Sequence, residues 1–482
     1  MRKHSNTSAF IAYSMVGVLC AAISFVTMIV LTRTVSEDFF GKINKFITAS
    51  NLIMSLICVG LDSAYIRFYY EPPPKTNHRQ LAWKCMTPPI MILIAISIII
   101  LLIRNSSSLI LLLGGGGFYF ATAFIITVLS QFFYRFMTIY FRMSSKILNF
   151  FIISIVFVVF TKTIFIPIYY LTPKFEQDIT LAAPILSIFT VLIFLFNMNK
   201  MVEVSHSPIT TYKPVYRYAL FSSPVFIIIY LNSYLPQIII SNSLGDNFLG
   251  IYSAASLFCS AILVLSTGFS TFWSPYMYKN YKSEQDTIKQ IHNVVLLGSV
   301  LVLSLILFFS DYFYLFIGET FRKNQNILGL LLIHPIILIV VETVACGIGI
   351  KKKNEITLVI YLISTAINVA LCFILVSTRG LAGIAFASMI SALVQFILMT
   401  YFGQKYYRSI KHIARTLLHI VVLILSAILF YFLYDNRPIF IFIEIAMLVI
   451  CMFCDRDVIV WGRKQLKTKI NEEKTNVDYT GV

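Results

Sequence analysis

Long, continuous runs of apolar residues alternate with short polar connections along the whole chain. Most runs are close to the ~20 residues that an α-helix needs to cross a bilayer. Because they are continuous, and not short segments of alternating hydrophobicity, they predict helices and not the strands of a barrel. We expect about fourteen transmembrane helices, at residues 9–31, 42–65, 85–103, 109–133, 147–171, 179–198, 217–240, 247–274, 290–310, 326–349, 356–377, 381–402, 414–433 and 438–454.

An internal repeat relates the second predicted helix to the eighth. Aligning Gly250 with Gly41 places Asp246 over Glu37. Each copy continues with an apolar stretch of about 20 residues, a second glycine and a basic, aromatic exit. A repeat of this kind predicts two similar lobes.

The helices and the repeat together predict an all-α, polytopic membrane protein with two pseudo-symmetric six-helix lobes. Helices 1 and 7 run in the same direction, so the lobes are expected to be parallel. The expected divisions are an N-lobe at 1–198, a cytoplasmic linker at 199–216, a C-lobe at 217–404, an extra helix pair at 405–454 and a cytoplasmic tail at 455–482.

Composition and charge exclude a soluble protein and orient the chain. Hydrophobic residues make up 58% of the sequence, and charged residues only 12%, about half the share in a soluble domain. Most of the 38 Lys and Arg residues fall on the side of the N-terminus, which predicts that both termini are cytoplasmic. The net charge of +17 thus reflects the excess of Lys and Arg on the cytoplasmic side of the membrane. These residues are spread over many short loops, which argues against nucleic-acid binding.

The sequence contains only incomplete forms of metal-binding and nucleotide-binding motifs. Cys451 and Cys454 have the spacing of a metal pair but no partner pair, and the eight cysteines are expected to be apolar fillers. The glycines at 114–117 lack the Lys-Ser or Lys-Thr of a phosphate-binding loop. We therefore expect no metal, no cofactor, no ATP-driven step and no enzymatic activity.

Three basic residues of the first lobe are candidates for binding an anion. Ionisable groups in a bilayer usually face a wet interior. Arg33, Lys45 and Lys162 lie in the predicted outer half, where they would suit a pyrophosphate or an acidic sugar. The alternative, strongest for Arg33, is that the side chain extends to the lipid headgroups.

Four more ionisable residues are candidates for gating or coupling. Asp62, Arg67 and Glu71 end the second predicted helix, where Asp62 and Arg67 would pair across a turn or with another helix. An exchangeable gate and a purely structural interfacial pair both fit this spacing. Glu342 has no basic residue within a turn, so it is a candidate for ion or proton coupling or a buried hydrogen-bonding acid.

Aromatic and amide side chains in the seventh predicted helix are candidates for sugar binding. Tyr230, Tyr234 and Gln237 share one helix face beside Asn232, and Pro236 weakens the helix there. Aromatic faces and amide hydrogen bonds suit a saccharide, although a structural kink explains the same pattern. Asn368 is a weaker candidate of the same kind.

Four stretches resemble blocks that recur in a known family. Residues 31–71, 243–258, 269–284 and 367–391 resemble bacterial polysaccharide biosynthesis transporters, the O-antigen and lipid-linked oligosaccharide flippases of the multidrug/oligosaccharidyl-lipid/polysaccharide exporter superfamily. The resemblance implies fourteen helices, two six-helix lobes around a central cavity, alternating access and a lipid-tail contact for the last two helices. Many relatives carry an arginine where this chain has residues 234–237, which argues against a charged site there.

The resemblance implies a flippase that moves a polyprenyl-pyrophosphate-linked oligosaccharide from the inner to the outer leaflet. The expected location is the bacterial cytoplasmic (inner) membrane, and the expected partners are this lipid-linked oligosaccharide, membrane lipids, a glycan polymerase and other polysaccharide assembly proteins. One alternative is an ion-coupled exporter of drugs or other amphiphiles from the same superfamily. Another is a membrane glycan polymerase or ligase, although the connections are short for a catalytic loop.

Overall fold

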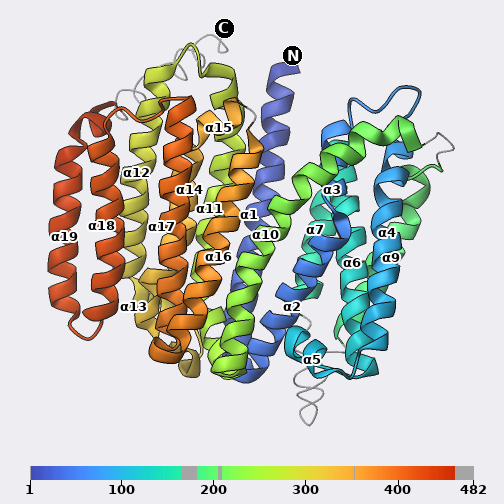
Figure 1. The fold of residues 1–482 in the computed structure, drawn as a ribbon, viewed down its shortest axis with the longest axis horizontal. Coiled ribbons are helices and arrows are strands. Elements are labelled where there is room, and N and C mark those ends of the chain that lie inside the picture. Colours follow the sequence, from blue (N-terminus) through green and yellow to red (C-terminus); the bar gives the residue numbers. More distant parts are fainter. Residues whose placement is uncertain (1, 145, 164–181, 205–208, 352, 462–482) are drawn as a thin grey trace, which may run out of the picture. The chain divides into compact units, whose positions relative to one another are not determined.

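The computed structural model describes residues 2–144, 146–163, 182–204, 209–351 and 353–461 (Figure 1). Within these ranges all regular structure is helical, and ten helices are long and apolar enough to span a membrane, or eleven if one bent pair counts as a single span. The predicted all-α, multi-pass membrane architecture is confirmed.

Each apolar run in the sequence corresponds to one helix or to a broken pair of helices. The α-helices are α1 Arg2–Thr34, α2 Glu37–Cys58, α3 Leu61–Phe68, α4 His78–Leu102, α5 Ser107–Leu113, α6 Phe118–Met143, α7 Ile147–Thr163, α9 Ala182–Met201, α10 Lys213–Ser243, α11 Asp246–Asn280, α12 Gln285–Phe308, α13 Ser310–Leu315, α14 Leu328–Val344, α15 Cys346–Ile350, α16 Asn354–Arg379, α17 Leu381–Tyr406, α18 Ile413–Phe432 and α19 Arg437–Cys454. Short 3-10 helices occur at Ile209–Tyr212, Glu319–Arg322 and Gln325–Ile327.

The second predicted helix is not continuous. It divides into α2 and α3, which are bent by 58° at Val59 and Gly60, both with positive φ. A Cβ on Gly60 would collide with the backbone carbonyl of Ala219 on α10, so the break lets α10 approach closely. The expectation of one straight helix over 42–65 is wrong at this point.

The fourth predicted helix is also interrupted, by the run of glycines. Gly114 and Gly117 both have positive φ and separate α5 from α6. After this turn α6 continues to Met143, well past the expected end at residue 133. As a result, Arg135 lies inside a long apolar helix and not in a loop.

The chain forms two compact units. Unit 1 comprises Met1–Leu257, Tyr314–Asn324 and Tyr361–Ala387, and unit 2 comprises Phe258–Phe313, Gln325–Ile360 and Ser388–Val482. The helices α11, α16 and α17 each contribute residues to both units. The division into two six-helix lobes therefore stays a prediction.

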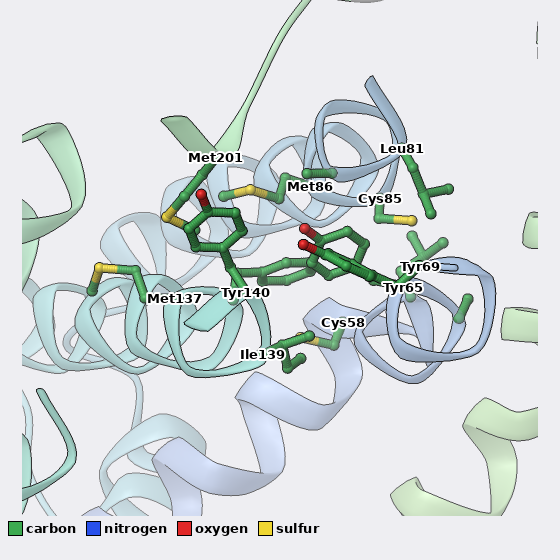
Figure 2. Close-up of a cluster of buried hydrophobic side chains, with 14 of the residues drawn as sticks. Cys58, Tyr65, Tyr69, Leu81, Cys85, Met86, Met137, Ile139, Tyr140 and Met201 are labelled. Carbon is green, nitrogen blue, oxygen red and sulfur yellow. The ribbon is translucent and has the colours of Figure 1, made fainter. Parts of the chain in front are cut away.

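The core of unit 1 is an aromatic and sulfur-rich cluster between α3, α4 and α6 (Figure 2). Tyr65 of α3 and Tyr69, directly after α3, meet at 5.6 Å between ring centroids, and Phe132 and Phe136 of α6 pack beside them. Aromatic pairs of this kind are worth about 0.5–1.5 kcal/mol beyond their buried area. The cluster fixes the ends of α2 and α6, and Cys58, at the end of α2, belongs to it.

Unit 2 is organised around α14. Of the described helices that are long enough to span a membrane, α14 is the most buried, with 78% of the residues in its most apolar stretch buried. The helices α12 and α18 pack against it. Close backbone approach also occurs here, because a Cβ on Gly403 of α17 would collide with the carbonyl oxygen of Val344. Small residues at such crossings let helices pack tightly in a membrane.

Candidate functional site

An amphipathic cavity of about 210 Å³ lies within unit 1, between α2, α3, α6, α7 and α10. This volume far exceeds the roughly 10–15 Å³ that one water molecule needs, so the cavity can be hydrated. We call it the central pocket of unit 1. It is lined by Asn51, Met54, Ser55, Cys58, Gly60, Asp62, Gln131, Tyr134, Arg135, Phe157, Phe226 and Tyr230.

An ion pair between α3 and α6 lies on the wall of this pocket. Arg135 donates hydrogen bonds from Nε and Nη2 to Asp62 Oδ2, at 3.0 and 2.9 Å. About half of the Arg135 side chain (51%) remains accessible, whereas Asp62 is mostly buried. Nη1 of Arg135 has no hydrogen-bond partner among the described residues, so this guanidinium can still donate to a ligand.

Local folding explains why these two side chains meet. The break at Gly60 ends α2 and places Asp62 in the first turn of α3, where a carboxylate is favoured by the helix dipole. On α6, Gln131, Tyr134 and Arg135 follow the spacing i, i+3, i+4 and therefore share one face. The opposite face of α6 is held in the aromatic core.

The remaining wall of the pocket is amphipathic. Gln131 donates to Ser50 Oγ at 2.9 Å, but its buried Oε1 has no hydrogen-bond partner in the described part of the chain. Tyr134 stacks on Phe157, with centroids 3.7 Å apart and planes at 6°. Tyr230 of α10 is 39% exposed and lines the pocket. A charged donor, amide groups and aromatic faces are thus available together.

A tight helix crossing lies at the other end of α2. A Cβ on Gly41 would collide with the carbonyl oxygen of Asp246, so α2 and the first turn of α11 are in backbone contact. Nearby, Lys45 is only 2% exposed and donates to Ser241 Oγ at 2.8 Å, and Ser241 in turn donates to Asp246. This crossing joins α2, α10 and α11 within unit 1.

Of the predicted cationic residues, Arg33 and Lys45 do not line the central pocket of unit 1. Lys45 belongs to the tight crossing. Arg33 is exposed and donates to the carbonyl oxygens of Phe316 and Leu315, both at 2.7 Å. Lys162 lies at the end of α7, but its side chain is outside the described residues. Protein oxygens bind both Arg33 and Lys45 here, and a cationic wall of Arg33, Lys45 and Lys162 stays a prediction.

The candidates on the seventh predicted helix separate into different environments. Tyr230 faces the pocket, whereas Tyr234 is buried and donates to the backbone carbonyl of Leu112. Asn232 accepts a hydrogen bond from Asn368 at 2.9 Å. Gln237 has a buried Oε1 without a hydrogen-bond partner among the described residues. The structure therefore does not bring Tyr230, Tyr234 and Gln237 together in a single sugar-binding face.

The predicted gate residues also have separate partners. Asp62 pairs with Arg135 on another helix, which is one of the two expected possibilities. Arg67 pairs instead with Glu71 at 3.0 Å, and both are exposed. In unit 2, Glu342 is half-buried and hydrogen-bonds Ser270, and its backbone carbonyl accepts from Trp273 at 2.9 Å. A coupling role for Glu342 stays a prediction.

Sequence reasoning missed Arg135, Gln131 and Asn51. Arg135 lies two residues beyond the end of the expected helix at residue 133, which places it in a predicted loop. A usable signal was present, since Gln131, Tyr134 and Arg135 follow helical spacing on a segment that is otherwise rich in apolar residues. The partner of Arg135 is 73 residues away in sequence and could not be assigned from spacing.

Solved structures show what this arrangement of helices is similar to. The chain matches the lipid II flippase MurJ in an inward closed conformation with a TM-score of 0.67 and 15% identity, over 93% of this chain and 100% of the other. It also matches an inward-facing multidrug resistance MATE transporter of the MOP superfamily, with a TM-score of 0.59, 14% identity and coverage of 81% and 94%. The chain has the fold of the MurJ and MATE transporters.

An outward-facing MATE transporter matches as well, with a TM-score of 0.54, 16% identity and coverage of 82% and 95%. Because inward-facing and outward-facing structures both match, the likeness shows the MurJ and MATE fold and not a particular transport state. No protein-family model matches the sequence, and no curated protein matches it.

Proposed function

We propose that this protein is a flippase that moves a polyprenyl-pyrophosphate-linked oligosaccharide from the inner to the outer leaflet by alternating access. The observation that carries the proposal is the half-accessible Arg135, held by Asp62 on the wall of an amphipathic pocket within a membrane protein. The MurJ-like fold supports the same class of substrate, because that neighbour is a lipid II flippase.

The pocket offers a chemically suitable site for the polar head of such a lipid. Arg135 can donate from Nη1 to a phosphate oxygen. It can also release Asp62 and bind a second phosphate oxygen instead, because guanidinium binds carboxylate and phosphate with the same geometry. Tyr134 and Tyr230 offer aromatic faces to a sugar ring, and Asn51 and Gln131 offer amide groups. The tail can stay in the bilayer while only the head enters the pocket.

Alternating access needs one end of the path to be closed while the other is open. In the predicted topology, the Gly41 end of α2 is the outer end and Asp62 is nearer the inner end. The crossing of α2 with α11 then closes the outer side, and the pocket lies on the inner side of it. This arrangement suits uptake of a head group from the inner leaflet.

The membrane potential is a sufficient driving force for this direction. An anionic pyrophosphate that moves outward follows an inside-negative potential, which supplies about 2.3 kcal/mol per charge per 100 mV. The sequence has no nucleotide-binding motif. We therefore assign the energy source to the potential or to an ion gradient.

The test is reconstitution of the purified protein into vesicles with a fluorescent polyprenyl-pyrophosphate oligosaccharide. Flipping is measured as the fraction of label that an external reductant or lectin can reach over time. We expect faster exchange than in protein-free vesicles, with a rate that rises with an imposed potential. Equal rates with and without protein would refute the proposal.

A second candidate is an exporter of drugs or other amphiphiles. The MATE-type neighbours support it, because one is a multidrug resistance transporter. Uptake of a cationic dye into everted vesicles discriminates the two proposals. Dye transport without lipid flipping would favour the exporter.

A further inference from the structure

The ends of α11, α15 and α17 meet on a small apolar cluster in unit 2. Its buried members are Trp273, Met277, Ile288 and Cys346. One residue from each end packs against them, namely Tyr281, Ile350 and Tyr407. The hydroxyl of Tyr407 donates to the backbone carbonyl of Tyr281 at 2.9 Å. A Cβ on Gly347 would collide with the carbonyl oxygen of Gly403, so α15 and α17 are also in backbone contact.

Each of these three ends continues directly into an exposed basic residue. These residues are Lys282, Lys351 and Arg408. A fourth exposed cation, Lys353, lies over the ring of Tyr406, with its Nζ 5.0 Å from the ring centroid. We call Lys282, Lys351, Lys353 and Arg408 the basic rim of unit 2. One apolar cluster thus holds cations from three separate loops at the same end of the unit.

The basic rim lacks acidic partners. Ion pairs in the described part of unit 2 use other basic residues, namely Lys289, Arg415, His419 and Arg437. Cations that are held near one another without a counter-ion raise the local positive potential, and a bound anion lowers it. The positive-inside rule explains why each loop is basic, but not why three loops are fixed on one base.

An exposed stripe on α17 indicates which kind of anion fits. Ile397, Tyr401 and Lys405 follow the spacing i, i+4, i+8 and therefore share one helix face. Ile397 is 61% exposed, Tyr401 is 63% exposed, and Lys405 is exposed as well. An apolar side chain, an aromatic ring and a cation in this order match the acyl chain, the interface and the headgroup of a lipid. A small water-soluble anion would contact only the last of the three.

We propose that the basic rim of unit 2 binds the phosphate of an anionic phospholipid, with an acyl chain along the α17 stripe. Ammonium and guanidinium groups bind phosphate oxygens at short range. The predicted topology places all three loops on the cytoplasmic side, where anionic lipids attract basic segments. No residue of the rim or the stripe lines the central pocket of unit 1, so this site does not depend on the proposed transport function.

The experiment is native mass spectrometry of the full-length protein in an uncharged detergent, titrated with phosphatidylglycerol, phosphatidylcholine or glycerol phosphate. We expect the first phosphatidylglycerol to bind at least tenfold more tightly than phosphatidylcholine, because only its headgroup has a net negative charge. Glycerol phosphate should bind more weakly than phosphatidylglycerol, because it cannot contact the stripe. Equal affinities for the two lipids would overturn the proposal. Equal affinities for phosphatidylglycerol and glycerol phosphate would show a site for free phosphate instead.

Variants locate the site. Lys351→Gln combined with Arg408→Gln should weaken phosphatidylglycerol binding roughly 25-fold, at about fivefold for each cation. Tyr401→Ser should weaken phosphatidylglycerol binding but leave glycerol phosphate binding unchanged. All three side chains are exposed, so the unfolding midpoint without lipid should stay near that of the wild type.

Lys289→Gln is the matched control, because Lys289 lies in the same unit but already pairs with Asp286 at 3.3 Å. It should bind phosphatidylglycerol with the affinity of the wild type. Wild-type affinity in the double variant would show that the rim is not the site. An equal loss of affinity in the control and in Lys351→Gln alone would show that only the total charge matters, which would also overturn the proposal.

Discussion

Gly41 and Gly250 make reciprocal backbone contacts across the crossing of α2 and α11. A Cβ on Gly41 would collide with the carbonyl oxygen of Asp246, and a Cβ on Gly250 would collide with that of Glu37. In the internal repeat Gly250 aligns with Gly41 and Asp246 with Glu37, so each copy presents the same surface to the other. Two related segments thus join within unit 1 through a symmetric contact that only glycine allows.

Enlarging either glycine should separate α2 from α11. Gly41→Leu places a side chain against backbone, which cannot move aside as a flexible side chain can, and overpacking of this kind costs roughly 1–3 kcal/mol. The unfolding midpoint in detergent should drop by several degrees. Gly298→Ala on α12 is the control, because a Cβ there has no neighbour within 4 Å. Equal midpoints for the two variants would show that the crossing is not tight.

Lys45 should hold the same crossing by its charge. It is buried between α2 and α10 and reaches Asp246 through Ser241, so Lys45→Met leaves Asp246 without a compensating cation. We expect a looser crossing and faster thiol labelling of a cysteine introduced at Ser253, which is buried on α11. Lys42→Met, which removes a half-exposed pair with Asp38, should leave labelling unchanged. If both variants label alike, the buried charge does not hold the crossing.

Asp62 should limit how tightly the pocket binds an anion. Asp62→Asn keeps the shape of the side chain but removes the charge that Arg135 now binds. Inorganic pyrophosphate, titrated calorimetrically at low salt, should bind about tenfold more tightly, or about 1.4 kcal/mol. Glu71→Gln changes an exposed carboxylate that pairs with Arg67 and should have no effect. Weaker binding to Asp62→Asn would mean that Arg135 needs Asp62 to stay in place.

The positions of the helices could be predicted from the sequence, because a span that crosses a bilayer needs a long apolar run wherever it packs. The break at Gly60 could not, since it depends on the approach of Ala219 from α10. The repeat around Gly41 identified two segments with one pattern, and the structure shows that they contact each other.

The site was less predictable than the fold, because its groups are set by partners that are far away in sequence. Lys45 suits anion binding by its place in the sequence, but its ammonium group donates to Ser241, which is 196 residues away. Arg135 is the opposite case, since it lies just beyond the predicted helix end at residue 133 and so was not a candidate. One face of that end of α6 packs in the aromatic core, and Arg135 on the other face pairs with Asp62.

The most direct test of the account compares lipid flipping by Arg135→Met and Arg67→Met in reconstituted vesicles. Both variants remove one guanidinium from the same region, but only Arg135 lines the pocket, whereas Arg67 is exposed and pairs with Glu71. The account predicts that Arg135→Met lowers the flipping rate at least tenfold, about 1.4 kcal/mol, and that Arg67→Met stays near the wild-type rate. Flipping by Arg135→Met at the wild-type rate would contradict a role for the pocket in binding the head group.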